Sequence, residues 1–179
     1  MNLNMIEKEK DIQLYKAIAK TGLITEDLAK LLGMSRNRLN NHIKEDNIIK
    51  KGVYMMFGDL TNIYTLSDKS KNKMRKDFLI DIYKSDTSQI EHDYVLAKIY
   101  MYLNYKEKES WITETGLKYM YQGKKTTDGL YITNNNRIGV EVITDSYSKS
   151  DIEEKKDFIR SCCDNYIMIH THKDIEYRL

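Results

Sequence analysis

The chain has 179 residues, of which 41% are hydrophobic and 31% are charged, and its formal net charge at neutral pH is +2. This composition is typical of a folded protein with solvated faces and argues against intrinsic disorder. No apolar run approaches the roughly 20 residues of a membrane-spanning helix, and the charged N-terminal segment lacks a signal-peptide core. We therefore expect a cytoplasmic protein without a membrane partner.

Charge is divided unevenly along the chain. Residues 1–84 carry 16 Lys and Arg against 11 Asp and Glu, whereas residues 85–179 carry 13 against 16. A basic first half attracts phosphate, and an acidic second half is compatible with carboxylates gathered around a cation. The two cysteines, Cys162 and Cys163, are adjacent, which fits neither a disulfide framework nor a zinc site and indicates a reducing compartment.

The first half begins with two predicted helices. Apolar residues recur at helical spacing over 7–21, and this helix should end at Gly22. Thr25 is a good N-cap for a short second helix, which has acidic residues in its first turn and should end at Gly33. Both helices should support the element that follows.

A third predicted helix, RNRLNNHIKED, follows Ser35, whose side chain can cap it. Its aliphatic anchors are only Leu39 and Ile43. Asparagine costs a helix about 0.5 kcal/mol against alanine, so a merely solvated helix would carry Glu and Lys instead. Asn can bond the adenine edge and Arg can bond guanine or phosphate, so this surface predicts DNA recognition. The expected contacts from this helix are Ser35, Arg36, Asn37, Arg38, Asn40, Asn41 and Lys44.

Residues 48–66 change to a strand-like pattern interrupted by a Gly-Asp turn, which predicts a β-hairpin. Lys50 and Lys51 at its base would lie near the DNA backbone, and a tip reaching Asn62 would enter the minor groove or touch phosphates. A purely stabilising hairpin is the alternative. The order of elements, with the segment TEDLAKLLGMSRNRLNNHI, resembles the winged helix-turn-helix family, which implies binding to double-stranded DNA.

The charged segment SDKSKNKMRKD then separates the two halves. It is either a linker or the exposed start of a connecting helix that reaches about Lys84, and Thr87 can cap the next helix. We therefore predict a first domain over 1–68, a linker or connecting helix over 69–84 and a second domain over 85–179.

The second half becomes strand-like beyond Trp111. The predicted elements are strands over 130–132, 138–143 and 166–170, with a helix over 151–163. An Asn-rich turn between the first two strands should place Asp128 and Glu141 side by side, close enough to share a cation. The expected fold class is α+β with two domains, the second a small α/β arrangement.

Four segments of the second half carry a further resemblance. EHDYVLAKIYMYL, SWITETGL, TDGLY and VEVITDSYSKSDIEEKK resemble the replication-relaxation family and the plasmid mobilisation relaxases related to restriction endonucleases. This resemblance implies a restriction-endonuclease-like domain of the PD-(D/E)xK type that uses magnesium or manganese. It implies Asp128 and Glu141 as catalytic metal ligands and Glu91, or Asp93, as a third carboxylate. Lys149 would stabilise the transition state.

The sequence departs from that pattern at two positions. Ile143 stands where a lysine is expected, and Thr127 replaces the usual proline before Asp128. Lys149 would have to supply the missing charge from the start of the next helix.

Other residues suggest weaker alternatives. His92, His170 and His172 could ligate zinc or iron, although scattered histidines without cysteine partners are more often ordinary packing and surface residues. Tyr147 could act as a nucleophile on phosphate in a strand-transfer reaction.

We expect a bacterial mobile-element protein, from a plasmid, phage or conjugative transposon, that binds a transfer or replication origin and nicks it there. The alternative is a non-enzymatic regulator or accessory factor whose nuclease-like domain mediates dimerisation or docking of other mobilisation or replication proteins. A transcription factor with a sensor domain would need a ligand pocket that the sequence does not reveal. Each hypothesis implies association with a plasmid or the nucleoid.

Overall fold

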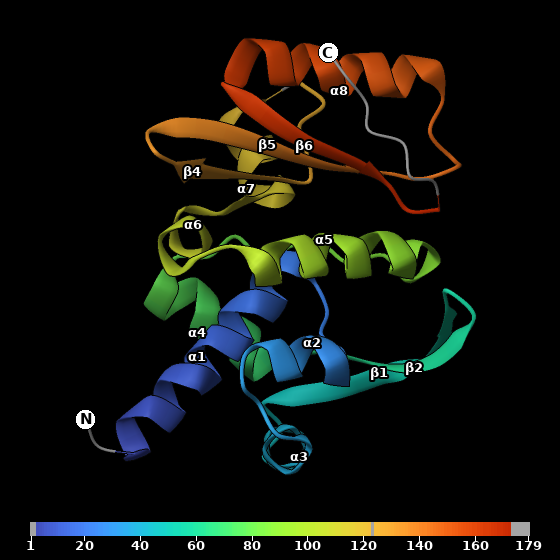
Figure 1. Cartoon of the computed structure of the whole chain (residues 1–179). Coiled ribbons are helices and arrows are strands. Elements are labelled where there is room, and N and C mark those ends of the chain that lie inside the picture. The colour runs from blue at the N-terminus through green and yellow to red at the C-terminus, as the bar shows by residue number, and fades with distance from the viewer. Residues whose placement is uncertain (1–2, 123, 173–179) are drawn as a thin grey trace. The chain divides into compact units, whose positions relative to one another are not determined.

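The computed structural model describes residues 3–122 and 124–172, with side chains from Lys8 onward, and has a mixed α+β fold with two small sheets (Figure 1). The chain divides into two compact units, residues 1–101 and 102–179. We predicted that the second would begin at residue 85, but helix α5 (Ile90–Tyr102) is grouped almost entirely with the first unit. Within the described residues, no helix combines the length and apolar character needed to cross a membrane.

The first unit begins with three helices and a hairpin. Its elements before α5 are α1 (Leu3–Thr21), α2 (Glu26–Leu31), α3 (Arg36–Lys44), β1 (Ile48–Met56), β2 (Asp59–Leu66), α4 (Asp68–Phe78) and the 3-10 helix η1 (Thr87–Gln89). The predicted caps are confirmed: the side chain of Thr25 accepts from the Leu28 amide, and that of Ser35 accepts from the Arg38 amide.

The β1–β2 hairpin is antiparallel and is joined to the helices by one isolated bridge. Ile24, between α1 and α2, exchanges two backbone hydrogen bonds of 2.9 and 3.0 Å with Tyr64 of β2. Ile48 and Ile63 are fully buried. The core formed by these strands and helices fixes the hairpin next to α2 and α3.

The predicted linker contains helix α4, which packs against α1 and β2 and buries Met74. The prediction that this helix reaches Lys84 is wrong. Leu79 adopts a left-handed conformation with φ of 53°, and its amide donates to the Met74 carbonyl, which ends the helix. Beyond it, the Tyr83 amide donates to the Ala19 carbonyl of α1 at 2.8 Å. Asp86, not Thr87, caps the helix that follows.

The second unit builds one four-stranded sheet in the order β3-β4-β5-β6. Its elements are α6 (Tyr105–Ser110), β3 (Ile112–Thr113), α7 (Glu114–Met120), β4 (Gly129–Thr133), β5 (Asn136–Ile143), α8 (Lys149–Cys162) and β6 (Asn165–His170). The first three strands are antiparallel, whereas β5 and β6 are parallel and are connected through α8, which lies along the sheet (Figure 1).

The predicted hairpin of β4 and β5 is confirmed. Asn134 and Asn135 both have positive φ angles, as a two-residue turn between these strands requires. The pairing runs from Thr133 opposite Asn136 to Gly129 opposite Val140. This register places the residues just beyond the last pair, Asp128 and Glu141, across from each other.

Candidate functional site

Helix α3 is anchored through two buried side chains, Leu39 and His42. We expected Ile43 to be the second anchor, but it is only half-buried, and His42 occupies the inward position. Because Leu39 and His42 are three positions apart, they lie on one face of the helix. The opposite face is left to the polar residues.

A network of charged side chains ties this helix to α1. The Asp11 carboxylate accepts hydrogen bonds from Arg38 Nε at 2.7 Å and Nη2 at 2.9 Å, and it lies 2.8 Å from His42 Nε2. The other ring nitrogen of His42 lies 2.8 Å from the Tyr15 hydroxyl. Burial alone would raise the pKa of Asp11, but the hydrogen bonds from Arg38 and His42 outweigh it and lower that pKa.

The outward face of α3 retains most of the predicted recognition residues. Exposed side chains on it are Ser35, Arg36, Asn37, Asn40, Asn41 and Lys44. Arg36 is 70% exposed and lies 3.3 Å from Glu26 of α2. Arg38 differs from the others, because its guanidinium is held by Asp11. We therefore assign Arg38 to the support of the helix instead of to the outward surface.

The hairpin exposes apolar side chains beside its two basic residues. Lys50 is exposed, and Lys51 and Asn62 are half-buried. Val53, Met55 and Leu60 are 52%, 61% and 73% exposed, and Met55 pairs with Leu60 across the strands. The hairpin therefore adds an apolar surface that we did not anticipate.

The tip of the hairpin is held by α5. The Phe57 amide donates to a Glu91 carboxylate oxygen at 2.9 Å, and the Phe57 ring lies 5.8 Å from the Tyr94 ring. Tyr94 in turn donates its hydroxyl hydrogen to Asp27 of α2 at 2.7 Å. Glu91, predicted as a metal ligand, thus bonds the hairpin of the first unit.

Asp128 and Glu141 lie together in the second unit, as predicted. The Asp128 amide donates to Glu141 Oε2 at 3.2 Å, and the Val142 amide donates to Asp128 Oδ2 at 2.8 Å. Both carboxylates are buried, Glu141 completely. Buried carboxylates require a compensating charge or several donors.

Lys155 of α8 supplies that charge. Its Nζ lies 2.9 Å from Glu141 Oε1 and 3.1 Å from Oε2, and it donates to the Thr126 carbonyl at 2.7 Å. Burial would lower the pKa of Lys155, but the Glu141 and Asp128 carboxylates raise it above its ordinary value. Lys149, the lysine that we predicted here, is exposed in the first turn of α8.

The sequence contained a signal for Lys155 that we missed. The buried residues of α8 are Lys155, Phe158, Ile159 and Cys162, which follow the 3–4 residue spacing of one helix face. A lysine on an otherwise apolar stripe indicates a buried charge and hence a nearby carboxylate. Lys149 lies outside that stripe.

In the described residues, the predicted magnesium ligands Asp128, Glu141 and Glu91 all have protein partners. Both oxygens of Glu141 contact Lys155, and Glu91 belongs to the first unit. Among residues 3–122 and 124–172, no three His, Cys, Asp or Glu side chains form a group that could hold a metal ion. Lys155 is thus an ion-pair partner of Glu141 that the prediction did not include.

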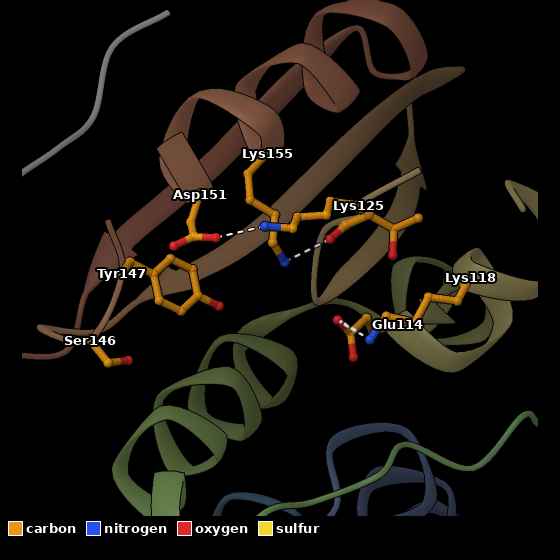
Figure 2. Close-up of a pocket in the computed structure, with 8 residues that line it drawn as sticks. Glu114, Lys118, Lys125, Ser146, Tyr147, Asp151 and Lys155 are labelled. Atoms are coloured by element: carbon orange, nitrogen blue, oxygen red, sulfur yellow. Dashed lines mark hydrogen bonds and ion pairs between the residues drawn. The ribbon is translucent and has the colours of Figure 1, made fainter. Parts of the chain in front are cut away.

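A pocket of about 390 Å³ lies beside this ion pair. Figure 2 shows Lys155 and Tyr147 extending from α8 and the segment before it, opposite Glu114 of α7. Lys118 pairs with Glu114 at 2.7 Å, and Lys125 pairs with Asp151 at 2.6 Å. Each lysine that lines the described pocket therefore has a carboxylate partner.

Tyr147 is poorly suited to the nucleophilic role considered above. Burial is the largest cause that raises the pKa of its phenol, and the nearby carboxylates of Glu141 and Asp128 raise it further. Its hydroxyl therefore resists deprotonation more than that of an ordinary tyrosine, which disfavours the attacking phenolate.

His92 and His170, two of the candidate histidine ligands, each lie near a carboxylate of their own unit. His92 Nδ1 lies 3.1 Å from Asp93, which also accepts from the Tyr83 hydroxyl at 3.0 Å in the first unit. His170 lies in the second unit, 3.5 Å from Asp145, and its ring accepts from the His172 amide. Asp93, our alternative third carboxylate, is thus buried among tyrosine and histidine partners.

No protein-family model, no curated protein and no solved structure matches this chain.

Proposed function

We propose that this protein binds a specific double-stranded DNA site through its first unit. The observation that carries the proposal is the outward face of α3, where Arg36, Asn40 and Lys44 follow helical spacing on a helix fixed from behind by Asp11. An exposed row of Arg, Asn and Lys matches the donors and acceptors of base edges and phosphates. A helix held by a bidentate ion pair presents such a row in one orientation.

The hairpin supports the same proposal. In a winged helix-turn-helix, a hairpin follows the recognition helix and contacts DNA beside it, and β1 and β2 follow α3 in this order. Lys50 and Lys51 at the base of the hairpin would contact phosphates, and α5 would hold its tip in place. As the sequence resemblance suggested, the site would be a transfer or replication origin of a mobile element.

Selection of duplexes from a random pool tests this proposal. The wild-type protein should enrich one sequence, and Arg36→Ala and Asn40→Ala should each weaken binding to it by roughly 1–3 kcal/mol. Lys84→Ala, an exposed lysine outside α3 and the hairpin, is the control and should retain the affinity. Unchanged affinity and unchanged preference in both α3 variants would remove this surface from the proposal.

The second unit would serve as a non-catalytic accessory domain. Lys155 forms an ion pair with Glu141, which supports the hypothesis of a degenerate nuclease fold that mediates dimerisation or docking of other mobilisation proteins. If the second unit serves for docking, only the first unit would bind DNA.

Metal-dependent nicking is the second candidate, because Asp128, Glu141 and a lysine do lie together. Incubation of supercoiled plasmid carrying the selected site, with and without magnesium or manganese, separates the two. The accessory proposal predicts bound, uncut plasmid. A nicked product that is lost in Asp128→Ala would instead support metal-dependent nicking by the second unit.

A further inference from the structure

A second pocket lies in the first unit. It is lined by residues of α1 and α4 and by Asn47, the residue just before β1. It has a volume of about 430 Å³, and its lining includes Lys8 and Asp11 of α1, Asn47, and Lys69 and Lys73 of α4. These residues come from segments far apart in the sequence.

The pocket carries an excess of positive charge. Across the described part of the chain, no acidic side chain forms an ion pair with Lys8, Lys69 or Lys73. Among the described lining residues, Asp11 is the one acidic residue, and its carboxylate is already bound by Arg38 and His42. Three ammonium groups around a neutralised carboxylate favour an anion, and lysine binds phosphate as a point charge.

The pocket is bonded directly to α3. Asp11 holds Arg38 and His42 of that helix, and Tyr15, which also lines the pocket, contacts the His42 ring. The Asn47 amide donates to the His42 carbonyl at 2.9 Å, and the Asn47 carbonyl accepts from the amide of Ser67, the cap of α4, at 3.2 Å. A ligand that moved α1 relative to α4 would therefore act on α3.

We propose that this pocket binds a phosphate-bearing anion and that its occupancy is coupled to the orientation of α3. The coupling rests on the proposed function, whereas the anion site does not. Two sources share this chemistry: a phosphate of the DNA backbone, and a free phosphorylated small molecule acting as an effector.

Titration of inorganic phosphate into the full-length, ¹⁵N-labelled protein at constant ionic strength tests the site. The amide signals of Asn47, Ser70 and His42 should shift saturably in the wild type. The shifts should be lost in Lys69→Gln/Lys73→Gln, while the dispersed spectrum shows that this variant remains folded. The control Lys76→Gln/Lys84→Gln changes charge equally at exposed residues outside the pocket and should keep the shifts. An unsaturable wild-type response, or shifts that survive in the pocket variant, would overturn the site.

Adding the selected duplex distinguishes the two sources. A backbone phosphate is indicated if the duplex shifts Asn47 and Ser70 and the pocket variant loses affinity for it. A free effector is indicated if the duplex leaves these signals in place, and inorganic phosphate changes the duplex affinity of the wild type but not of the pocket variant. If phosphate binds but changes no duplex affinity, and the pocket variant binds duplex normally, the coupling is wrong. Phosphate binding by a protein that binds no duplex would overturn the proposed function and leave the anion site standing.

Discussion

Asp11 is the residue on which the orientation of α3 depends. Its carboxylate joins α1 to Arg38 and His42, two residues of a helix that otherwise has one aliphatic anchor in the core. Hydrogen bonds to a charged group of this kind contribute more than neutral ones, about 1.5–3 kcal/mol each. Asp11 thus has a larger structural role than any exposed residue of α3.

Asp11→Asn should lower the free energy of unfolding by about 1–3 kcal/mol at neutral pH, because Arg38 loses its bidentate partner. The folded protein lowers the pKa of Asp11 below its ordinary value of 3.8, so this stabilisation is full above 3.8 and is lost as pH falls through the lower, folded value. Urea denaturation across a pH series measures both effects. Asp59→Asn, at an exposed hairpin carboxylate, should change neither; an Asp11→Asn curve that overlays the wild type would contradict the assignment.

The buried pair of Lys155 and Glu141 gives a second residue-scale prediction. Lys155→Met should destabilise the second unit by about 3–5 kcal/mol, because Glu141 is left in the core without its cation. Lys155→Met/Glu141→Gln should recover most of that loss, since the lone charge is removed. Thermal unfolding compares these variants with Lys149→Met, the exposed lysine of the same helix, which should behave as the wild type. A Lys155→Met protein as stable as this control would show that Lys155 and Glu141 do not form this ion pair in solution.

At the residue scale, the sequence predicted that Asp128 and Glu141 lie together, but not that Lys155 contacts Glu141. Asp128 and Glu141 follow from the turn at Asn134 and Asn135, because strand register is a local property. Whether Lys155 or Lys149 reaches these carboxylates depends on how α8 packs on the sheet. The role of His42 was missed because its partner, Asp11, is 31 residues away in the chain.

Among the elements, those with local end signals were predicted well. Thr25 and Ser35 cap their helices as expected, and the hairpin turns fall where Gly58 and the Asn-rich segment place them. The segment after Phe78 was predicted wrongly, because its apolar residues suggested a longer helix. The hydrogen bond of the Tyr83 amide to α1 and the left-handed conformation of Leu79 override that periodicity.

The hold of α5 on the hairpin gives a prediction at the scale of elements. Glu91→Ala should remove the acceptor of the Phe57 amide, which costs about 1 kcal/mol and should speed exchange of that amide roughly fivefold. Hydrogen exchange followed by NMR measures this at the tip, with Asp59→Asn as the matched control. If exchange at Phe57 is unchanged in Glu91→Ala, α5 does not restrain the tip.

For the whole molecule, the basic and acidic halves correspond to different kinds of site. The first unit presents an outward polar helix and a cationic pocket, whereas the second buries its carboxylates around Lys155. The α+β class is confirmed, and the structure groups most of α5 with the first compact unit, whereas we placed residues 85–179 in the second domain. That helix is joined to α2 and the hairpin by long-range contacts of Tyr94 and Glu91, which local patterns do not reveal.

Binding of the selected duplex as a function of salt tests the central claim most directly. Fluorescence anisotropy would give affinities for the selected duplex and for a scrambled one, in the wild type, Asn40→Ala and Lys84→Ala. Wild type and Lys84→Ala should prefer the selected duplex, and Asn40→Ala should lose roughly 1–3 kcal/mol of that preference while its salt dependence stays the same, because asparagine reads bases and not phosphates. Equal affinity of the wild type for both duplexes, or an Asn40→Ala variant with the full preference, would contradict the account.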